Sequence, residues 1–426
     1  MNNFQKLLFV TFLLIRPFSI AQVRNLEQLK EAYSNPKVIT DICMTKQDLR
    51  GTILLNKIHR FTNLEIFVIR DCQIDEIPSS ICRLKKLTHL ELSGCLNNHV
   101  PNCIGKLSTL ESLYLFRNQL THLPESIAKL KNLTRLDINN NMFTTIPPVI
   151  FELSRLKRLE LESNQLDSIS TGVNRLCELK WLNLSDNHIS QFPSSLNGLL
   201  NLEFLNLNKN KITHLPTCIG DLRKLGALGL SYNALQNLPA ELKYINKLEW
   251  LELSHNNFKL VPPVLCLMRG LEGLDLSHNQ LSVFPKEMSS HQSLSSLNLS
   301  NNKLSHLPDV LGTYYGLSVL EADSNQITYI TDSIGNCINL YFVNLDYNRL
   351  KTLPASMSRI KNLWYLHLDH NELVQIPDTI WTMSGLYQVH LMGNPELDCG
   401  HIDDIAHDLY YNDRFLRRQP LIYCEQ

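Results

Sequence analysis

Two histidines, His367 and His390, stand 23 residues apart, and Asp369 lies close to the first of them in the sequence. On neighbouring strands, roughly 5 Å apart, two imidazoles and this carboxylate could hold a zinc ion. Solvated histidines are far commoner than metal ligands, so we predict no metal and no other cofactor. His255 and His278 have the same spacing of 23 residues. Their protonation near pH 6.5 would weaken a local negative field.

Other residue patterns argue against catalysis. The sequence contains no Gly-rich phosphate loop, no nucleophile elbow, no His-Glu-x-x-His and no Cys-x-x-Cys pair. Its 40 basic and 41 acidic residues give a net charge of −1, which argues against general nucleic-acid binding. We therefore predict a protein that is neither an enzyme nor a nucleic-acid-binding protein.

The 23-residue spacing of the histidines is the period of a sequence repeat that covers most of the chain. Leucine recurs every 23 residues from Leu64 to Leu386, without an insertion or a deletion. In each unit, Leu-x-x-Leu-x-Leu predicts a short strand, and Pro before apolar residues three apart predicts a helical or 3₁₀ turn. Stacking must provide the stability, because no unit can bury its leucines alone. We predict an α/β solenoid: a horseshoe with a concave parallel sheet, convex 3₁₀ or short-helix segments and a cap at each end.

Asparagine fills the ninth position of thirteen units, from Asn118 to Asn394. An amide there can bond the backbone of neighbouring turns where the strand bends away. Cys72 and Cys95 occupy this column in the first two units, where a thiol can donate weaker bonds to the same carbonyls. We interpret the column as scaffold and not as a redox pair.

The ends of the chain differ from the repeats. Residues 1–21 resemble a cleaved signal peptide, with an apolar run of nine residues that is too short to span a bilayer. Residues 22–63 are predicted as an N-terminal cap, made of a helix that starts at Asn25 and a degenerate strand. Residues 64–398 hold fifteen repeats, the last partial, and residues 399–426 form a C-terminal cap with a short amphipathic helix from Ile402 to Leu409.

The chain has eleven cysteines, an odd number that leaves at least one unpaired in a monomer. Cys399 and Cys424 bracket the C-terminal cap, and we predict a disulfide between them in an oxidising compartment. Packing as small apolar side chains is expected for the cysteines at convex or interior positions: Cys82, Cys103, Cys177, Cys218, Cys266 and Cys337.

The informative variation lies at the third, fifth, seventh and eighth positions of each unit, which are expected to line the concave face. Basic and acidic residues mix there in the first seven units. From the eighth unit onward these positions contain no lysine or arginine, and their aspartates and glutamates are no longer balanced. Aromatic residues among charges are typical of a protein interface, although they could also tile the sheet by cross-strand packing. The predicted partner-binding residues are Trp181, Phe204, Tyr232, Trp250, His255, Asp275, His278, Glu321, Phe342, Asp346, Tyr347, Tyr365, His367 and Asp369.

The consensus Leu-Pro-x-x-Ile-x-x-Leu, seen at Leu123-Pro124 with Ile127 and at Leu215-Pro216 with Ile219, resembles that of leucine-rich-repeat proteins. It is similar to the Ras-suppressor and scaffold class and to exported bacterial leucine-rich-repeat proteins. The resemblance covers nearly the whole mature chain. It implies the solenoid fold, but it says little about the ligand, because this class binds many partners on one scaffold.

We therefore expect a non-catalytic, exported module that recognises a protein or peptide on its concave face. The partner is expected to be basic toward the C-terminal half. The mature protein is expected in the secreted, periplasmic or extracellular space, with no membrane span. The alternative is an intracellular-type signalling scaffold that acts in a cytoplasm, either that of its own cell or that of a host cell after translocation. N-terminal processing separates the exported module from the scaffold. The sequence indicates neither the partner's identity nor the oligomeric state.

Overall fold

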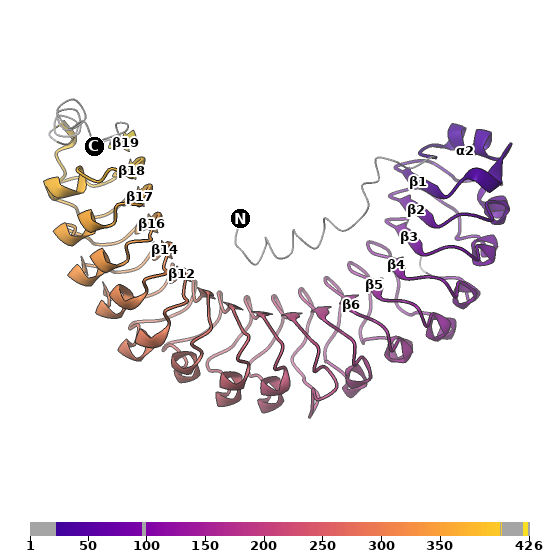
Figure 1. Ribbon diagram of the computed structural model, residues 1–426, viewed down its shortest axis with the longest axis horizontal. Helices are drawn as coiled ribbons and strands as arrows, with labels where there is room; N and C mark the ends of the chain where they lie inside the picture. The colour runs from indigo at the N-terminus through magenta and orange to yellow at the C-terminus, as the bar shows by residue number, and fades with distance from the viewer. Residues whose placement is uncertain (1–22, 96–98, 401, 403–420, 425–426) are drawn as a thin grey trace. The chain divides into compact units, whose positions relative to one another are not determined.

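The computed structural model describes residues 23–95, 99–400, 402 and 421–424, so the predicted signal segment 1–21 lies outside the described residues. The chain divides into two compact units, which are described separately here. Unit 1 comprises Met1–Ile212 and Cys218–Ala227, and unit 2 comprises Thr213–Thr217 and Leu228–Gln426. Within each unit the strands line the inner side of the curve and the 3₁₀ turns line its outer side (Figure 1).

The strands of unit 1 are parallel, and each pairs with the next along the chain. The repeat length sets the register, so that Leu113 on one strand lies beside Leu136 on the next. The strands are β1 (Asp41–Thr45), β2 (Ile66–Arg70), β3 (His89–Ser93), β4 (Ser112–Tyr114), β5 (Arg135–Asp137), β6 (Arg158–Glu160), β7 (Trp181–Asn183) and β8 (Phe204–Asn206). Strand β9 (Ala227–Gly229) falls at the boundary of the units.

The strands of the main sheet in unit 2 are also parallel, and each pairs with the next strand of that sheet. Its main sheet contains β10 (Trp250–Glu252), β11 (Gly273–Asp275), β12 (Ser296–Asn298), β14 (Val319–Glu321), β16 (Phe342–Asn344), β17 (Tyr365–His367), β18 (Gln388–His390) and β19 (Leu421–Tyr423). A two-residue pairing joins β13 (His306–Leu307) to β15 (Tyr329–Ile330).

Proline and the apolar residues that follow it form the outer turns. In η6 (Glu125–Lys129), Pro124 stands at the N-cap in extended conformation and Ile127 is buried. The others in unit 1 are η2 (Pro36–Val38), η3 (Leu55–Arg60), η4 (Ser79–Arg83), η5 (Ile104–Lys106), η7 (Pro148–Glu152) and η8 (Thr171–Arg175), and η9 (Thr217–Asp221) crosses the boundary. Those in unit 2 are η10 (Ala240–Tyr244), η11 (Pro263–Leu267), η12 (Lys286–Ser290), η13 (Asp309–Thr313), η14 (Asp332–Asn336), η15 (Ala355–Arg359) and η16 (Asp378–Ile380). These turns confirm the 3₁₀ segments expected from the sequence.

The core between strands and turns is a column of leucines bounded by the asparagine column. Leu113 and Leu136 are buried, as are their equivalents in every other described repeat. Asn256 shows how the asparagine acts: its Nδ2 donates to the Leu230 and Leu253 carbonyls (2.9 and 3.1 Å), and its Oδ1 accepts from the Leu235 N–H. Such bonds satisfy backbone groups that the bend removes from the strand ladder. The scaffold interpretation of the column is therefore confirmed.

The thiols in this column behave as expected. Cys72 Sγ donates to the carbonyls of Met44 and Arg70, and Cys95 Sγ donates to those of Ile69 and Ser93. Burial is the first cause that raises the pKa of Cys95 to about 12. A thiol this weakly acidic is a poor nucleophile, so both cysteines serve the backbone.

The N-terminal cap begins with helix α2 (Leu26–Ala32), whose N-cap Asn25 accepts the Gln28 N–H at 2.9 Å. The Gln28 side chain in turn accepts from the backbone N–H of Arg24, one residue before the position that a capping box predicts. Strand β1 then buries Ile42 and Met44 and pairs with β2. The helix and the first strand expected from the sequence are both present.

The C-terminal cap contributes a strand that sequence analysis did not predict. Strand β19 pairs in parallel with β18, Gln388 opposite Leu421. Most of the predicted helix from Ile402 to Leu409 lies outside the described residues, and Ile402 itself is buried. No helix among the described residues has the length and apolarity to cross a bilayer.

Two cysteine pairs lie at disulfide-bonding distance. Cys399 pairs with Cys424, as expected. Cys82 pairs with Cys103, with Cα atoms 5.8 Å apart, so the expectation that these two pack as small apolar side chains is wrong. They occupy the nineteenth position of one repeat and the seventeenth of the next. Their separation of 21 residues hides their adjacency on the outer side of the stack.

Candidate binding surface

The side chains at the third, fifth, seventh and eighth positions of the repeats form what we call the strand face. The third and fifth positions lie on the strands, on the side opposite the buried leucines. The eighth position has a different geometry, because its residue adopts the left-handed conformation. Non-glycine examples include Asp71, Asn140, His255 and Tyr347, with φ from 51° to 54°. This conformation costs roughly 1–2 kcal/mol in each residue other than glycine.

Sequence analysis missed this left-handed column. The sequence carries a signal for it, since Gly94 and Gly393 fill the column in two repeats, also with positive φ. Asparagine and aspartate, which tolerate this conformation, recur there as well. The strict column aligns neighbouring eighth-position side chains, and aromatic rings in it stack. Tyr232 stacks on His255 at 3.9 Å between centroids, and His255 on His278 at 3.8 Å.

The charges of the unit 1 strand face pair with each other. Arg70 contacts Glu91 at 2.5 Å, and Arg158 contacts Glu160 at 2.7 Å. Both carboxylates are nearly inaccessible, at 4% and 6% exposure. Removing either arginine would leave a buried charge unpaired, so these pairs are part of the structure of the face.

The burial of carboxylates between these strands changes their acidity. Asp137 lies beside Glu160 in the register of β5 and β6. Burial, followed by the charge of Glu160, raises the pKa of Asp137 to about 7. Burial also raises the pKa of Glu160, against the opposing effect of Arg158. A carboxyl group with a pKa of about 7 can take up or release a proton near neutral pH.

Two of the predicted anchors are not surface residues. Trp181 is 8% exposed and Phe204 is 1% exposed. Their rings stack at 3.5 Å, and the Arg158 guanidinium covers Trp181 at 4.4 Å from the ring centroid. The expectation that Trp181 and Phe204 are exposed anchors is therefore wrong, because the flat rings of adjacent strands cover each other. Cross-strand packing, the alternative interpretation, describes them.

The aromatic residues of unit 2 are more accessible. Tyr232 and Tyr347 are 49% and 57% exposed, and Trp250, Phe342 and Tyr365 are half-buried. Trp250 lies over the next strand, where a Cβ on Gly273 would collide with the indole ring. That glycine leaves room for the ring at the third position of the following repeat. Unlike Trp181, Trp250 remains partly open to a partner.

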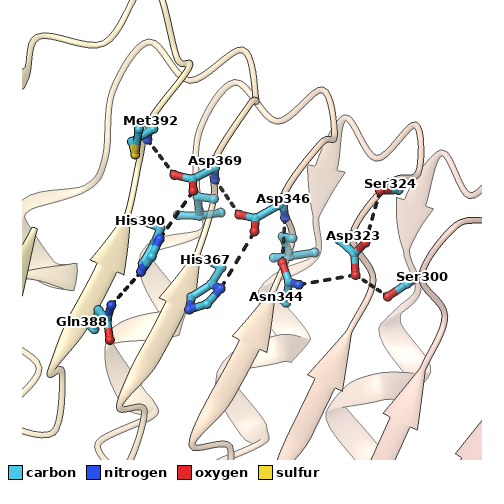
Figure 2. A network of polar contacts seen from close by, with 12 residues as sticks. Ser300, Asp323, Ser324, Asn344, Asp346, His367, Asp369, Gln388, His390 and Met392 are labelled. Atoms are coloured by element: carbon cyan, nitrogen blue, oxygen red, sulfur yellow. Dashed lines mark hydrogen bonds and ion pairs between the residues drawn. The ribbon is translucent and has the colours of Figure 1, made fainter. Parts of the chain in front are cut away.

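Three aspartates form a row at the C-terminal end of the unit 2 strand face, with two histidines beside them (Figure 2). Asp346 accepts the backbone N–H of Asp369 at 2.6 Å, and Asp369 accepts that of Met392 at 2.7 Å. Asp323 accepts from the hydroxyl of Ser300 at 2.5 Å. Each carboxylate therefore bonds to the next repeat or to the preceding one. The row is held in place by the same stacking that forms the sheet.

The histidines pair with this row. Nδ1 of His367 is 3.9 Å from Asp346, and Nδ1 of His390 is 3.4 Å from Asp369. Their rings stack with centroids 4.2 Å apart, and Phe342 contacts His367 edge-on at 5.2 Å. Stacked rings do not aim their nitrogens at a common point. Among the residues that the structure describes, no group of three or more His, Cys, Asp or Glu side chains is arranged to hold a metal ion.

Burial shifts several acid–base equilibria in this region. It raises the pKa of Asp346 to about 6, with the charge of Asp369 acting in the same direction. Burial also raises the pKa of Glu321, helped by Asp275. The pKa values of His255 and His367 are lowered by burial first and then by the neighbouring histidines. Burial thus favours the uncharged forms of these carboxyl and imidazole groups.

A shallow hollow of about 620 Å³ lies in unit 1, at the edge where the strands begin. Sequence analysis did not identify it, because its lining comes from the second and twenty-third positions, outside the strand face. The lining is polar throughout: Thr88, Thr109, Glu111, Asn132, Thr134, Arg155, Lys157 and Glu178. Several of these side chains form hydrogen bonds with the backbone or with each other. For example, the Arg155 guanidinium donates to Oδ1 of Asn132 at 2.9 Å.

A parallel stack of 23-residue units with inward leucines, outer 3₁₀ turns and a backbone-bonding asparagine column defines the leucine-rich-repeat class. Family models described as leucine-rich repeats match residues 131–189, 177–235, 246–304 and 269–327, and a two-copy model matches residues 108–150. The chain belongs to the leucine-rich-repeat family. Its sequence matches none of the curated proteins.

Solved structures give the same assignment. A leucine-rich-repeat protein of Leptospira interrogans is 31% identical with a TM-score of 0.84, over 92% of this chain and 98% of that one. The ectodomain of the Arabidopsis thaliana receptor kinase GASSHO1/SCHENGEN3, solved with CASPARIAN STRIP INTEGRITY FACTOR 2, is 26% identical with a TM-score of 0.63, over 84% of this chain and 47% of that one. The functional domain of InlJ from Listeria monocytogenes, described as including a cysteine ladder, shares the fold at 20% identity and a TM-score of 0.56, over 74% of this chain and 70% of that one.

Proposed function

We propose that this protein is a non-catalytic, exported binding module that holds a protein or peptide partner on its strand face. The accessible row of aromatic and acidic side chains in unit 2 carries the proposal. Tyr347 is 57% exposed on this row, and the polar network of Asp346 and Asp369 holds the adjacent charges in place. Large rings beside fixed charges are the usual anchors of protein interfaces.

The relatives support a role in recognition. The receptor ectodomain that resembles this chain was solved as a complex with a named ligand. The leucine-rich-repeat family consists generally of binding modules. The partner contacts are proposed at the accessible residues Tyr232, Trp250, His255, Asp275, His278, Glu321, Phe342, Asp346, Tyr347, Tyr365, His367 and Asp369. Because the charged residues at these positions of unit 2 are carboxylates, we propose a basic partner segment there.

Export is supported by the cysteines. Two pairs lie at bonding distance, and disulfides persist in oxidising compartments outside the cytoplasm. Intact mass of the protein from its native host tests this directly. We expect a chain that begins at Gln22 and gains mass on reduction and alkylation of Cys399 and Cys424. A chain that retains Met1–Ala21 with every thiol free would contradict export and favour the cytoplasmic scaffold.

Site-specific photo-crosslinking tests the binding surface. A photoreactive phenylalanine analogue replaces Tyr347 on the strand face or, as the matched control, Tyr244 on the outer turn η10, which is 44% exposed. Each variant is incubated with surface and extracellular proteins of the native environment. We expect a discrete crosslinked species from position 347 that is missing from position 244. Equal crosslinking from both positions would rule out the strand face as the binding surface.

A further inference from the structure

The unit 2 strand face has an unusual set of ionisable groups. In the six repeats that begin at Leu248 through Leu363, together with the last one at Leu386, its four positions contain no lysine or arginine. Its carboxylates are Glu252, Asp275, Glu321, Asp323, Asp346 and Asp369, and its imidazoles are His255, His278, His367, His370 and His390. The formal charge of the face is therefore −6 with neutral histidines and −1 with all five protonated.

The contrast with unit 1 shows that the fold does not require this composition. At the same four positions, the first seven repeats carry five basic and six acidic residues. Pairs such as Arg70 with Glu91 and Arg158 with Glu160 neutralise much of that charge internally. Lysine and arginine keep their charge through the physiological range, whereas histidine does not. The strand face of unit 1 thus carries permanent positive charges, whereas the positive charges available to that of unit 2 come from imidazoles.

The histidines lie where protonation affects the carboxylates most. His367 contacts Asp346, and His390 contacts Asp369, at 3.9 and 3.4 Å. The other groups around them are Phe342 on β16, Gln388 on β18, whose Nε2 is 2.8 Å from Nε2 of His390, and Tyr423 on β19, with its ring 4.7 Å from His390. Of these flanking groups, only the tyrosine is ionisable, and it stays neutral in mild acid.

A second group of histidines lies further along the same face. His255 is stacked between Tyr232 and His278, and the charge of Asp275 acts on it. Tyr347 likewise stacks on His370 at 4.4 Å. These stacks place imidazoles beside two exposed tyrosines of the strand face. A positive charge gained there would act directly on a ligand that contacts those rings.

We propose that the unit 2 strand face binds a basic partner segment at neutral pH and releases it in mild acid. This inference rests on the proposed function, and it adds the chemistry of the partner and the condition for its release. At neutral pH the carboxylates attract lysine and arginine side chains, with the exposed rings available for cation–π contacts. As the histidines protonate, they pair with the aspartates and replace the partner's cations.

The titration of the buried carboxylates acts in the same direction. The pKa of Asp346 is raised to about 6, so this group also loses its negative charge as the solution becomes acidic. The pKa of His367 is lowered by burial and by His390, so its protonation requires a lower pH than that of an ordinary imidazole. Successive groups thus change charge across a range of pH values, and we expect gradual release over that range.

The test uses an arginine–glycine peptide labelled with tetramethylrhodamine, because neither its side chains nor its dye changes charge in this range. Binding to the full chain is measured by fluorescence anisotropy at low salt, at about pH 7.5 and about pH 5.5. We expect binding at the higher pH and an affinity that is about tenfold lower, or weaker still, at the lower pH. A serine–glycine peptide with the same label is expected not to bind at either pH.

Variants assign the effect to the face. Replacing His255, His278, His367, His370 and His390 by glutamine should remove most of the loss in acid, read as the ratio of each variant's own affinities at the two pH values. The part of the loss that remains is expected from the protonation of Asp346. The His367→Gln/His390→Gln double variant should remove only part of the loss, and circular dichroism confirms that each variant is folded. The matched control is His122→Gln/His188→Gln, two exposed histidines of unit 1 outside the strand face. This control should behave as the wild type.

The outcomes separate the two proposals. Peptide binding that is equally strong at both pH values, or an acid loss of undiminished size in the five-histidine variant, overturns histidine-driven release and leaves the binding face intact. Failure of the peptide to bind at neutral pH overturns the basic partner and its release together. In that case, crosslinking from Tyr347 decides separately whether the face binds another kind of protein.

Discussion

Single residues of the strand face divide into those that hold the sheet together and those that remain accessible. Trp181 and Trp250 occupy the same third position of their repeats, yet Trp181 is covered by Phe204 and Arg158, whereas Trp250 lies over Gly273 and is only half-buried. The alternation of the strand predicts the side on which each ring lies. It does not predict whether neighbouring side chains, such as Phe204 and Arg158, cover the ring, and this decides whether the ring is accessible.

Asp137 should lower the stability of the folded chain at neutral and alkaline pH. Its pKa is raised to about 7, so the folded chain holds a proton that the unfolded chain has lost once the pH exceeds the ordinary aspartate value. The unfavourable contribution grows as the pH rises toward 7 and is then constant. We expect Asp137→Asn to raise the melting temperature at about pH 8 and to change it little at about pH 4. Calorimetry measures both, with the exposed Asp167→Asn as control. A stabilisation of equal size at both pH values would contradict this origin.

Asn256 should be essential for the stability of its repeat. Asn256→Ala leaves the buried Leu235 N–H without its acceptor, which costs roughly 1–3 kcal/mol. It also removes one of the two asparagine donors to each of the Leu230 and Leu253 carbonyls, which keep their bonds to Asn233 and Asn279. The neighbouring Asn257 is exposed, and Asn257→Ala should change the free energy of unfolding by less than about 0.5 kcal/mol. Chemical denaturation compares them. Equal effects would show that the column is dispensable.

Among the elements, the strands and outer turns could be predicted from the sequence, because each unit repeats one pattern of leucine, asparagine and proline. The capping strand β19 could not, since no repeat motif marks Leu421–Tyr423. The left-handed column was also missed. Its residues differ widely in type, and only Gly94, Gly393 and the Asn and Asp members indicate it.

Adjacent outer turns provide a second position for a disulfide. Cys266 occupies the nineteenth position of its repeat, and Glu287 occupies the seventeenth of the next, as Cys82 and Cys103 do in unit 1. The charge of Glu287 already helps to raise the pKa of Cys266, after the larger effect of burial. We expect Glu287→Cys to form a disulfide with Cys266 and to stabilise unit 2 by about 3 kcal/mol.

Thiol counting by mass spectrometry after alkylation detects this bond, and reduction should reverse the gain in melting temperature. Glu287→Ser is the control for loss of the charge alone. If Cys266 and the cysteine introduced at position 287 stay reduced under oxidising conditions, the turns η11 and η12 are not arranged as η4 and η5 are.

For the molecule as a whole, stability depends on contacts between successive repeats, since each repeat buries its leucines only against its neighbours. Leu207 is fully buried near the middle of the repeat array. A charge there should uncouple the repeats before it from those after it, and we expect Leu207→Asp to split thermal unfolding into two steps. The matched control is Leu200→Asp, because Leu200 is 52% exposed. A single transition like that of the wild type would contradict this model.

The constant register of the strands sets a length scale for any extended partner that crosses them. In unit 2, His367 lies opposite His390, and each equivalent position advances by one strand, roughly 4.8 Å. An extended peptide advances by roughly 3.3 Å per residue, so three of its residues span about the same distance as two repeats. Every third residue of a linear ligand would therefore lie over the equivalent position of every second repeat. Its recognition motif should be a periodic pattern of basic residues, readable in the partner's own sequence.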